Sequence, residues 1–241
     1  MFSTKNTRID FLIYTLQGGI LIVLFAYTFI LHRRINKLNK KIADISAAAA
    51  PVAAPVKLTF SKTSPAIGAD SAKVIMTIFS DFECEFCKVF AREVFPQIKS
   101  KYVDKGLVKV YFRFLPLDIH QHAVLAAETG AYANETGKFW ELHDIMFDNQ
   151  RNLNISTLSK WVSSKQIDTV KFKAALQKHT YKNKIDEDIA EAHRVGITGT
   201  PAIVVNGNVT MGAMSVNYYS KLIEKELSGA QATNNAGACN E

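Results

Sequence analysis

Two cysteines separated by two residues, Cys84 and Cys87, carry the most reactive side chains of this 241-residue chain. An apolar run over residues 74–79 precedes them, and a segment with helical periodicity follows. This order of strand, Cys-x-x-Cys and helix places a dithiol where backbone N–H groups and the helix dipole favour a thiolate. A thiolate is the nucleophile of thiol-disulfide exchange, so the pattern predicts a redox-active disulfide.

The two sulfurs are expected to have different roles. Cys84 begins the helix and is predicted to be the nucleophile, whereas Cys87 lies one turn further in and is predicted to resolve mixed disulfides with clients. A zinc site would need two more ligands, and the sequence has no second Cys-x-x-Cys, so we expect no metal and no bound cofactor. We expect packing or surface roles for His120, His122 and His143, which lie among apolar residues.

The apolar periodicity predicts an α/β domain. Strands are expected at residues 56–60, 74–80 and 107–117, and a hairpin is expected at 202–206 and 208–211 around Gly207. A helix is expected after the cysteines, and Pro96 should either kink it or begin a second helical piece. Further helices are expected at 123–133, 138–147, 157–163, 168–178, 182–195 and 216–227. The result is a βαβ half and a ββα half separated by a helical block.

Four ordered motifs carry a family resemblance. They are FSDFECEFC at 79–87, FRFLPL at 112–117, KFWELHD at 138–144 and GITGTP at 196–201. With them, the chain resembles the DsbA-like thiol-disulfide oxidoreductases, which have a thioredoxin fold with an inserted all-helical domain. The resemblance implies a catalytic domain over 57–228, a helical insertion over about 118–195, and a DsbB-like membrane partner that reoxidises the dithiol.

The same resemblance gives Thr200 and Pro201 a role. They match the family's loop in which a cis-proline lies beside the Cys-x-x-Cys motif. Cis peptide bonds are nearly confined to X-Pro, and a cis bond here would turn the backbone of Thr200 toward a client. We expect both residues to bind substrate, with the client chain adding as a short extended strand.

The residues around Cys84 are expected to tune its redox behaviour. Glu85 stands where many family members have proline, and Phe86 stands where a strongly oxidising member has histidine. Together with Asp81 and Glu83, Glu85 puts three carboxylates near Cys84, and negative charges raise the pKa of a thiol. We therefore expect a reduction potential more negative than that of the strongest family oxidants. In the alternative, all three carboxylates point into solvent and have little effect.

The charge distribution argues against a nucleic-acid partner. Residues 1–56 hold seven Lys/Arg and two Asp/Glu, a net charge of +5, which leaves 22 against 20, or +2, for residues 57–241. The domain has no basic cluster interleaved with aromatic residues, so we expect no nucleic-acid binding.

The N-terminal region predicts a membrane tether. Residues 1–10 form a short tail, and residues 11–31 are uncharged over the length of a transmembrane helix. Residues 32–46 carry apolar positions at heptad spacing, which fits either a self-associating helix or one lying on the lipid surface. Residues 47–56 read as an Ala/Pro linker and residues 229–241, including Cys239, as a disordered tail.

The orientation of this tether is a choice between two signals. The basic residues after the span favour a cytoplasmic domain. A Cys-x-x-Cys oxidant is useful mainly where disulfides persist, and long domains can be exported despite a charge bias. We expect a single-pass protein of the cytoplasmic membrane with its catalytic domain on the periplasmic side.

The predicted function is disulfide formation or exchange in exported proteins that contain cysteines. A reductase or isomerase of the same fold is the nearest alternative, favoured by the acidic Cys-x-x-Cys dipeptide and by self-association through residues 32–46. A tethered metal-handling or chaperone module without electron transfer is a third candidate. The first two differ in reduction potential, and the third would form no mixed disulfides through Cys84.

Overall fold

The computed structural model describes residues 24–25, 27–35, 55–61 and 63–237, and the chain divides into two compact units, residues 1–53 and 54–241. In the first unit, the described residues 24–25 and 27–35 are helical. None of the helices among the described residues is both long and apolar enough to cross a membrane. Most of the predicted span at 11–31, most of the predicted helix at 32–46 and most of the linker at 47–56 lie outside the described residues.

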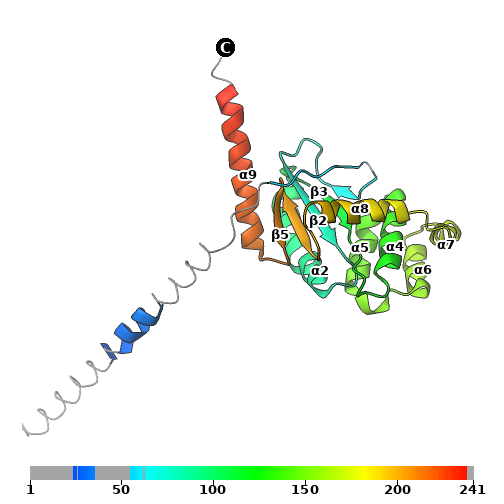
Figure 1. The fold of residues 1–241 in the computed structure, drawn as a ribbon, viewed down its shortest axis with the longest axis horizontal. Coiled ribbons are helices and arrows are strands. Elements are labelled where there is room, and N and C mark those ends of the chain that lie inside the picture. Colours follow the sequence, from blue (N-terminus) through cyan, green and yellow to red (C-terminus); the bar gives the residue numbers. More distant parts are fainter. Residues whose placement is uncertain (1–23, 26, 36–54, 62, 238–241) are drawn as a thin grey trace, which may run out of the picture. The chain divides into compact units, whose positions relative to one another are not determined.

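A five-stranded mixed sheet forms the centre of the second unit (Figure 1). Its strand order is β1-β3-β2-β4-β5. The strands are β1 (Ala66–Ile67), β2 (Val74–Ser80), β3 (Val108–Phe114), β4 (Ala202–Val205) and β5 (Asn208–Met211). As predicted, β3 runs parallel to β2, and β4 and β5 form an antiparallel hairpin. Its turn uses Asn206 and Gly207, both with positive φ, which glycine adopts without steric cost.

The predicted first strand at residues 56–60 is wrong. Its backbone is bound by side chains and a turn: Glu191 accepts from the Thr59 N–H, Arg113 donates to the Thr59 carbonyl, and the Val56 N–H donates to Gly207. With these groups already bonded, the segment makes no strand ladder. The sheet edge is formed by β1, which pairs antiparallel with β3.

The helices follow the predicted order. They are α2 (Glu85–Val89), α3 (Phe95–Ile98), α4 (Ala123–Glu135), α5 (Phe139–Asp148), α6 (Ile155–Ser164), α7 (Thr169–Gln177), α8 (Lys182–Arg194) and α9 (Val216–Gly237). Of the two alternatives for Pro96, the structure has the second: Pro96 lies in the first turn of a second helical piece, α3, and a π-helical turn at Phe90–Val94 separates α3 from α2. Proline has no N–H to donate to the preceding helical turn, and the π-helical turn lies directly before the helix that contains Pro96.

Helix α9 corrects the C-terminal prediction. The disordered tail was expected over residues 229–241, but α9 is helical to Gly237. Alanine is the strongest helix former, and this segment contains several, so a helix nucleated by packed residues can propagate through it. Residues 238–241, and with them Cys239, lie outside the described residues.

Two apolar clusters cover the two faces of the sheet. Along β2, Met76 and Ile78 belong to the larger cluster, which includes α2, α9 and the helical block, whereas Phe79 belongs to the smaller one. Side chains of a strand alternate between faces, which explains this division. The smaller cluster includes Ala192 of α8, so the last helix of the insertion packs back on the sheet.

A buried ion cluster fixes α8 to β3. The side chains of Arg113 and Asp188 are 4% and 0% exposed, and their charged atoms lie 2.6 Å apart. Glu191 lies 3.6 Å from the same guanidinium, and Lys184 pairs with Asp188. Buried charges are tolerated when each has a partner, so this cluster depends on all its members.

Replacing Arg113 tests this dependence. Arg113→Met leaves the Asp188 and Glu191 carboxylates short of positive charge, and we expect the free energy of unfolding to fall by about 3–5 kcal/mol in chemical denaturation. The matched control is Arg92→Met, because Arg92 makes exposed ion pairs with Asp144 and Asp148. This variant should lose about 1 kcal/mol or less. Equal losses in the two variants would refute the importance of the buried cluster.

Candidate functional site: a dithiol at the start of helix α2

The sheet register brings the two predicted motifs together. Phe79, near the end of β2, is paired with Ala202, at the start of the antiparallel strand β4. The segment that leaves β2 and the segment that enters β4 therefore lie side by side. Cys84 comes from the first segment and Thr200 from the second, and the Cys84 thiol donates to the Thr200 carbonyl at 3.4 Å.

The two cysteines carry free thiols and differ in accessibility. Cys84 keeps 6% of its surface exposed and Cys87 only 1%. The two sulfurs are within hydrogen-bonding contact of each other. A client can therefore reach Cys84, and Cys87 is close enough to attack a disulfide formed there.

The surroundings of Cys84 stabilise its thiolate. The hydrogen bond from the Cys87 thiol makes the largest contribution, and hydrogen bonds from Thr200 and from the backbone N–H groups of Cys87 and Phe86 add to it. Partial burial acts in the opposite direction, but the net result is a pKa of Cys84 lowered to about 6. Most of Cys84 is thus ionised at neutral pH in the reduced protein.

Cys87 has the opposite character. Burial raises the pKa of Cys87 well above its usual value, and the hydrogen bond and charge of Cys84 raise it further. Within the reduced pair, Cys84 therefore carries the negative charge and Cys87 the proton. The proton on Cys87 is also the one that stabilises the Cys84 thiolate.

The loop around Pro201 provides the wall beside Cys84. The peptide bond between Thr200 and Pro201 is cis, and the Pro201 carbonyl accepts from the Gly212 N–H at 2.7 Å. The Thr200 hydroxyl is buried and makes no hydrogen bond to another protein atom among the described residues. A hydroxyl can rotate, so this one is free to donate to the Cys84 thiolate.

The expectation that nearby carboxylates raise the pKa of Cys84 is wrong. Glu85 is exposed, where water screens its charge. Asp81 and Glu83 bind His120 and His122 of the loop after β3. The histidines, for which we expected only packing or surface roles, therefore lie beside the site. His143 is buried among aromatic rings, as expected for a packing residue.

Gln150 is a further residue that the sequence did not indicate. It lies in a 3₁₀ turn of the helical insertion, and its Nε2 donates to the carbonyls of Phe82 and Cys84 at 2.8 and 2.9 Å. The side chain thereby joins the insertion to the first turn of α2. No local pattern distinguishes this glutamine from a surface glutamine, because its partners are 68 and 66 residues away.

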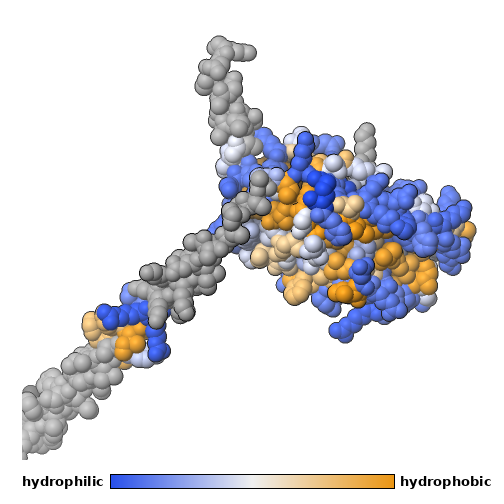
Figure 2. Space-filling view, in the orientation of Figure 1, coloured by the Kyte–Doolittle hydropathy of each residue, from blue (hydrophilic) through white to orange (hydrophobic). Residues whose placement is uncertain are grey.

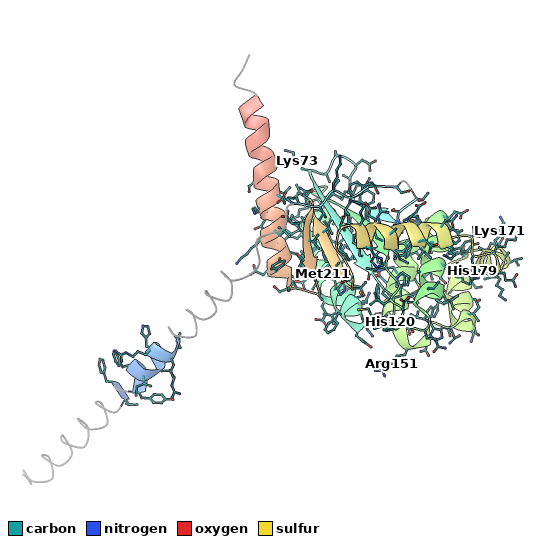
Figure 3. All side chains as sticks on the ribbon, viewed as in Figure 1. Lys73, His120, Arg151, Lys171, His179 and Met211 are labelled. Atoms are coloured by element: carbon teal, nitrogen blue, oxygen red, sulfur yellow. The ribbon has the colours of Figure 1, made fainter. Side chains whose placement is uncertain are left out.

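Exposed apolar side chains occur within the Cys-x-x-Cys motif, in the loop after β3 and at the end of the β4–β5 hairpin. Phe86 is 67% exposed, and Ile119, Met211 and Met214 are exposed as well. On the face drawn in Figure 2, apolar surface lies between hydrophilic areas, and Figure 3 labels Met211 and His120 on the second unit. Such side chains offer apolar contacts to an unfolded chain. Among the described residues, no group of three His, Cys, Asp or Glu side chains could hold a metal ion.

Comparison with known proteins agrees with this geometry. The sequence profile of a family described as thioredoxin matches residues 60–225. Disulfide bond formation protein D of Bacillus subtilis is 31% identical over 182 residues, which cover 70% of this chain and 79% of that protein. The crystal structure of oxidised BdbD from Bacillus subtilis superposes with a TM-score of 0.66 at 29% identity, covering 72% of this chain and 98% of the other.

A second solved structure shows the same fold at lower identity. Alpha-DsbA1 of Wolbachia pipientis has a TM-score of 0.65 at 23% identity and covers 73% of this chain and 96% of the other. The fold, together with the Bacillus relatives, defines the class of the protein as a thioredoxin-fold protein disulfide oxidoreductase. The chain belongs to the thioredoxin family and within it is DsbA-like.

The lowered pKa of Cys84 predicts its reactivity. In the reduced protein, alkylation of Cys84 by iodoacetamide should increase with pH about a midpoint near pH 6, while Cys87 should react slowly through neutral pH. Cys87→Ala should still react at Cys84 but with a higher midpoint, because alanine removes the side-chain donor to the Cys84 thiolate. A wild-type midpoint near the unperturbed value of about 8.5 would contradict this assignment.

The same pKa predicts a pH dependence of stability. The folded-state pKa of Cys84 lies below its unfolded value of about 8.5, so the unfolded state binds more protons between these values. Reduced wild-type protein should therefore lose stability relative to reduced Cys84→Ser as the pH falls from about 8.5 through 6. Urea denaturation of both proteins across this range measures the difference, and a constant difference would contradict the prediction.

Proposed function

We propose that this chain is a dithiol oxidase that introduces disulfides into exported proteins, with Cys84 as the reactive sulfur and Cys87 as the resolving one. The observation that carries the proposal is the opposite behaviour of the two thiols, with the pKa of Cys84 lowered to about 6 and that of Cys87 raised. Stabilising the thiolate stabilises the reduced protein, which makes the disulfide form a better oxidant.

The reaction proceeds by two exchanges. A client thiolate attacks the Cys84 sulfur of the oxidised protein, the Cys84–Cys87 bond breaks, and Cys87 leaves and takes up a proton. A second client thiolate then attacks the client sulfur of the mixed disulfide and releases Cys84 as a thiolate. Two electrons pass from the client to the protein, the client gains one disulfide, and the chain is left as a dithiol.

Thr200 and Pro201 are proposed to hold the client beside Cys84. The contact between the Cys84 sulfur and the Thr200 carbonyl supports this role, because it places the Thr200 backbone next to the reacting atom. The exposed side chain of Phe86 adds apolar surface at the same place. We further propose that Phe86 tunes the potential through its backbone N–H, and that Glu85 tunes it only weakly, because it is exposed and water screens its charge.

The proposed location is the periplasmic side of the cytoplasmic membrane. The uncharged residues 11–31 are proposed to form a single-pass anchor, and residues 32–46 to support self-association. An oxidase needs reoxidation, so a DsbB-like membrane partner is proposed to accept its electrons. The redox chemistry supports the exported side, because disulfides persist in oxidising compartments.

A reductase or isomerase remains the second candidate because of one observation. The Cys84 pKa of about 6 is higher than the value of about 3.5 for the strongly oxidising DsbA, so the thiolate is less stabilised here. An oxidase forms disulfides in a reduced client, whereas an isomerase also corrects a client with mispaired disulfides. Assays with a reduced and a scrambled client separate the two, and efficient correction of the scrambled client would favour the isomerase.

Removing the resolving sulfur tests the assignment of roles. Cys87→Ser should accumulate mixed disulfides between Cys84 and clients that already carry a disulfide. The Cys84 thiolate attacks the client disulfide, one client thiol leaves, and no Cys87 thiol is present to release the adduct. Non-reducing electrophoresis followed by mass spectrometry measures the adducts. Cys84→Ser/Cys87→Ser is the control and should form none. If Cys87→Ser also forms none, the protein is a binding module without electron transfer.

A further inference from the structure

A buried carboxylate lies three residues before the reactive cysteine. Asp81 is 2% exposed, and each of its oxygens has a partner. Oδ1 accepts from the Glu83 N–H at 2.8 Å, and Oδ2 accepts from the Leu117 N–H at 2.8 Å and lies 2.7 Å from His120 Nδ1. The Asp81 carbonyl also accepts from the Cys84 N–H at 3.2 Å, so the backbone joins this carboxylate to the dithiol.

The loop that follows β3 supplies the histidine. This loop runs from Leu115 to His122, and its backbone is held by Leu117 on Asp81 and by His122 on Glu83. His122 Nδ1 also lies 3.2 Å from the Glu83 carboxylate. Both acids that precede Cys84 are therefore matched with a histidine of one loop, but only the pair of Asp81 with His120 has a fully buried carboxylate.

By itself, the buried negative charge of Asp81, three residues before Cys84, should oppose a thiolate at Cys84. A protonated His120 cancels that charge. Partial burial by itself would lower the pKa of His120, but the hydrogen bond and charge of Asp81, with the charges of Cys84 and Glu83, raise it above its usual value. Since the attraction between His120 and Cys84 is mutual, a charged His120 also favours the Cys84 thiolate.

Several other ionisable groups lie near Asp81 and His120 in the sequence. Glu83 and His122 face each other, and Cys87 is more deeply buried than Cys84. Asp118, in the same loop, and Glu85, on α2, are both exposed, and neither is bonded to Asp81 or His120 among the described residues. His120 is thus the cation paired with the buried carboxylate next to Cys84, and 22% of its side chain remains open to solvent protons.

We propose that His120 is a positioning residue for charge, whose protonated ring neutralises Asp81 and so helps to hold Cys84 as a thiolate. This role rests on the proposed oxidase function and adds a positioning residue to the same site. As the pH rises and His120 loses its proton, the net charge of the pair changes from zero to minus one. The thiolate is then less favoured than it would be beside a permanent cation.

Two replacements of His120 separate charge from structure. His120→Gln keeps a hydrogen-bond donor for Asp81 but removes the charge, and it should raise the pKa of Cys84 and lower its alkylation rate near pH 6 by about three- to tenfold. His120→Lys supplies a charge that does not titrate near neutral pH, and it should restore the low pKa. A merely structural role would predict no such recovery, since lysine resembles histidine less in shape than glutamine does.

The matched control is His179→Gln. His179 Nδ1 lies 3.2 Å from the carboxylate of Glu128, so it makes a similar pair, and Figure 3 shows it far from His120. This variant should leave the pKa of Cys84 unchanged. The readout is the ultraviolet absorbance of the thiolate against pH in the full-length reduced protein, with far-ultraviolet circular dichroism to verify folding.

The outcomes test the role of His120 separately from the oxidase function. If His120→Gln leaves the pKa of Cys84 unchanged, or if His120→Lys fails to restore it in a folded protein, the role of His120 is refuted and the oxidase function stands. If wild-type protein shows the His120 effect but does not oxidise reduced clients, the proposed oxidase function is refuted and the electrostatic role of His120 stands.

Discussion

The site depends on the set of hydrogen bonds to one sulfur. Cys84 is contacted by the Cys87 thiol, by two backbone N–H groups of α2 and by Thr200. Three of these donors come from the same helical turn, but Thr200 is 116 residues away along the chain. The low pKa of Cys84 is therefore a property of the folded domain, because only the sheet holds both parts of the set in contact.

The rest of the fold maintains this contact. Strands β2 and β4 are adjacent and antiparallel, so the end of β2 and the start of β4 bring the two halves of the site together. The helical insertion contributes Gln150, which bonds the carbonyls before and within the Cys-x-x-Cys turn. Helix α8 returns the chain from the insertion to the sheet, and the buried pair of Arg113 with Asp188 anchors it on β3. Each device limits movement of the segments that carry Cys84 and Thr200.

Much of this arrangement could be predicted from the sequence, because its signals are local. The apolar run of β2, the Cys-x-x-Cys turn, the start of α3 at Pro96 and the hairpin at Gly207 each follow from neighbouring residues. The failures involve partners distant in sequence. Residues 56–60 have strand-like composition, but Glu191 and Arg113 bind the Thr59 backbone. Asp81 and Glu83 were expected to oppose the Cys84 thiolate, but histidines 39 positions later bind them.

The central claim is that hydrogen bonds to Cys84 make this protein an oxidant of intermediate strength, and its reduction potential measures this most directly. Equilibration with glutathione redox buffers, followed by quantification of both protein forms, should give a value between about −270 mV for thioredoxin and about −120 mV for DsbA. The Cys84 pKa of about 6 lies between the thiol pKa values of those two proteins, about 7 and about 3.5. A potential at or below that of thioredoxin, or level with that of DsbA, would contradict the account.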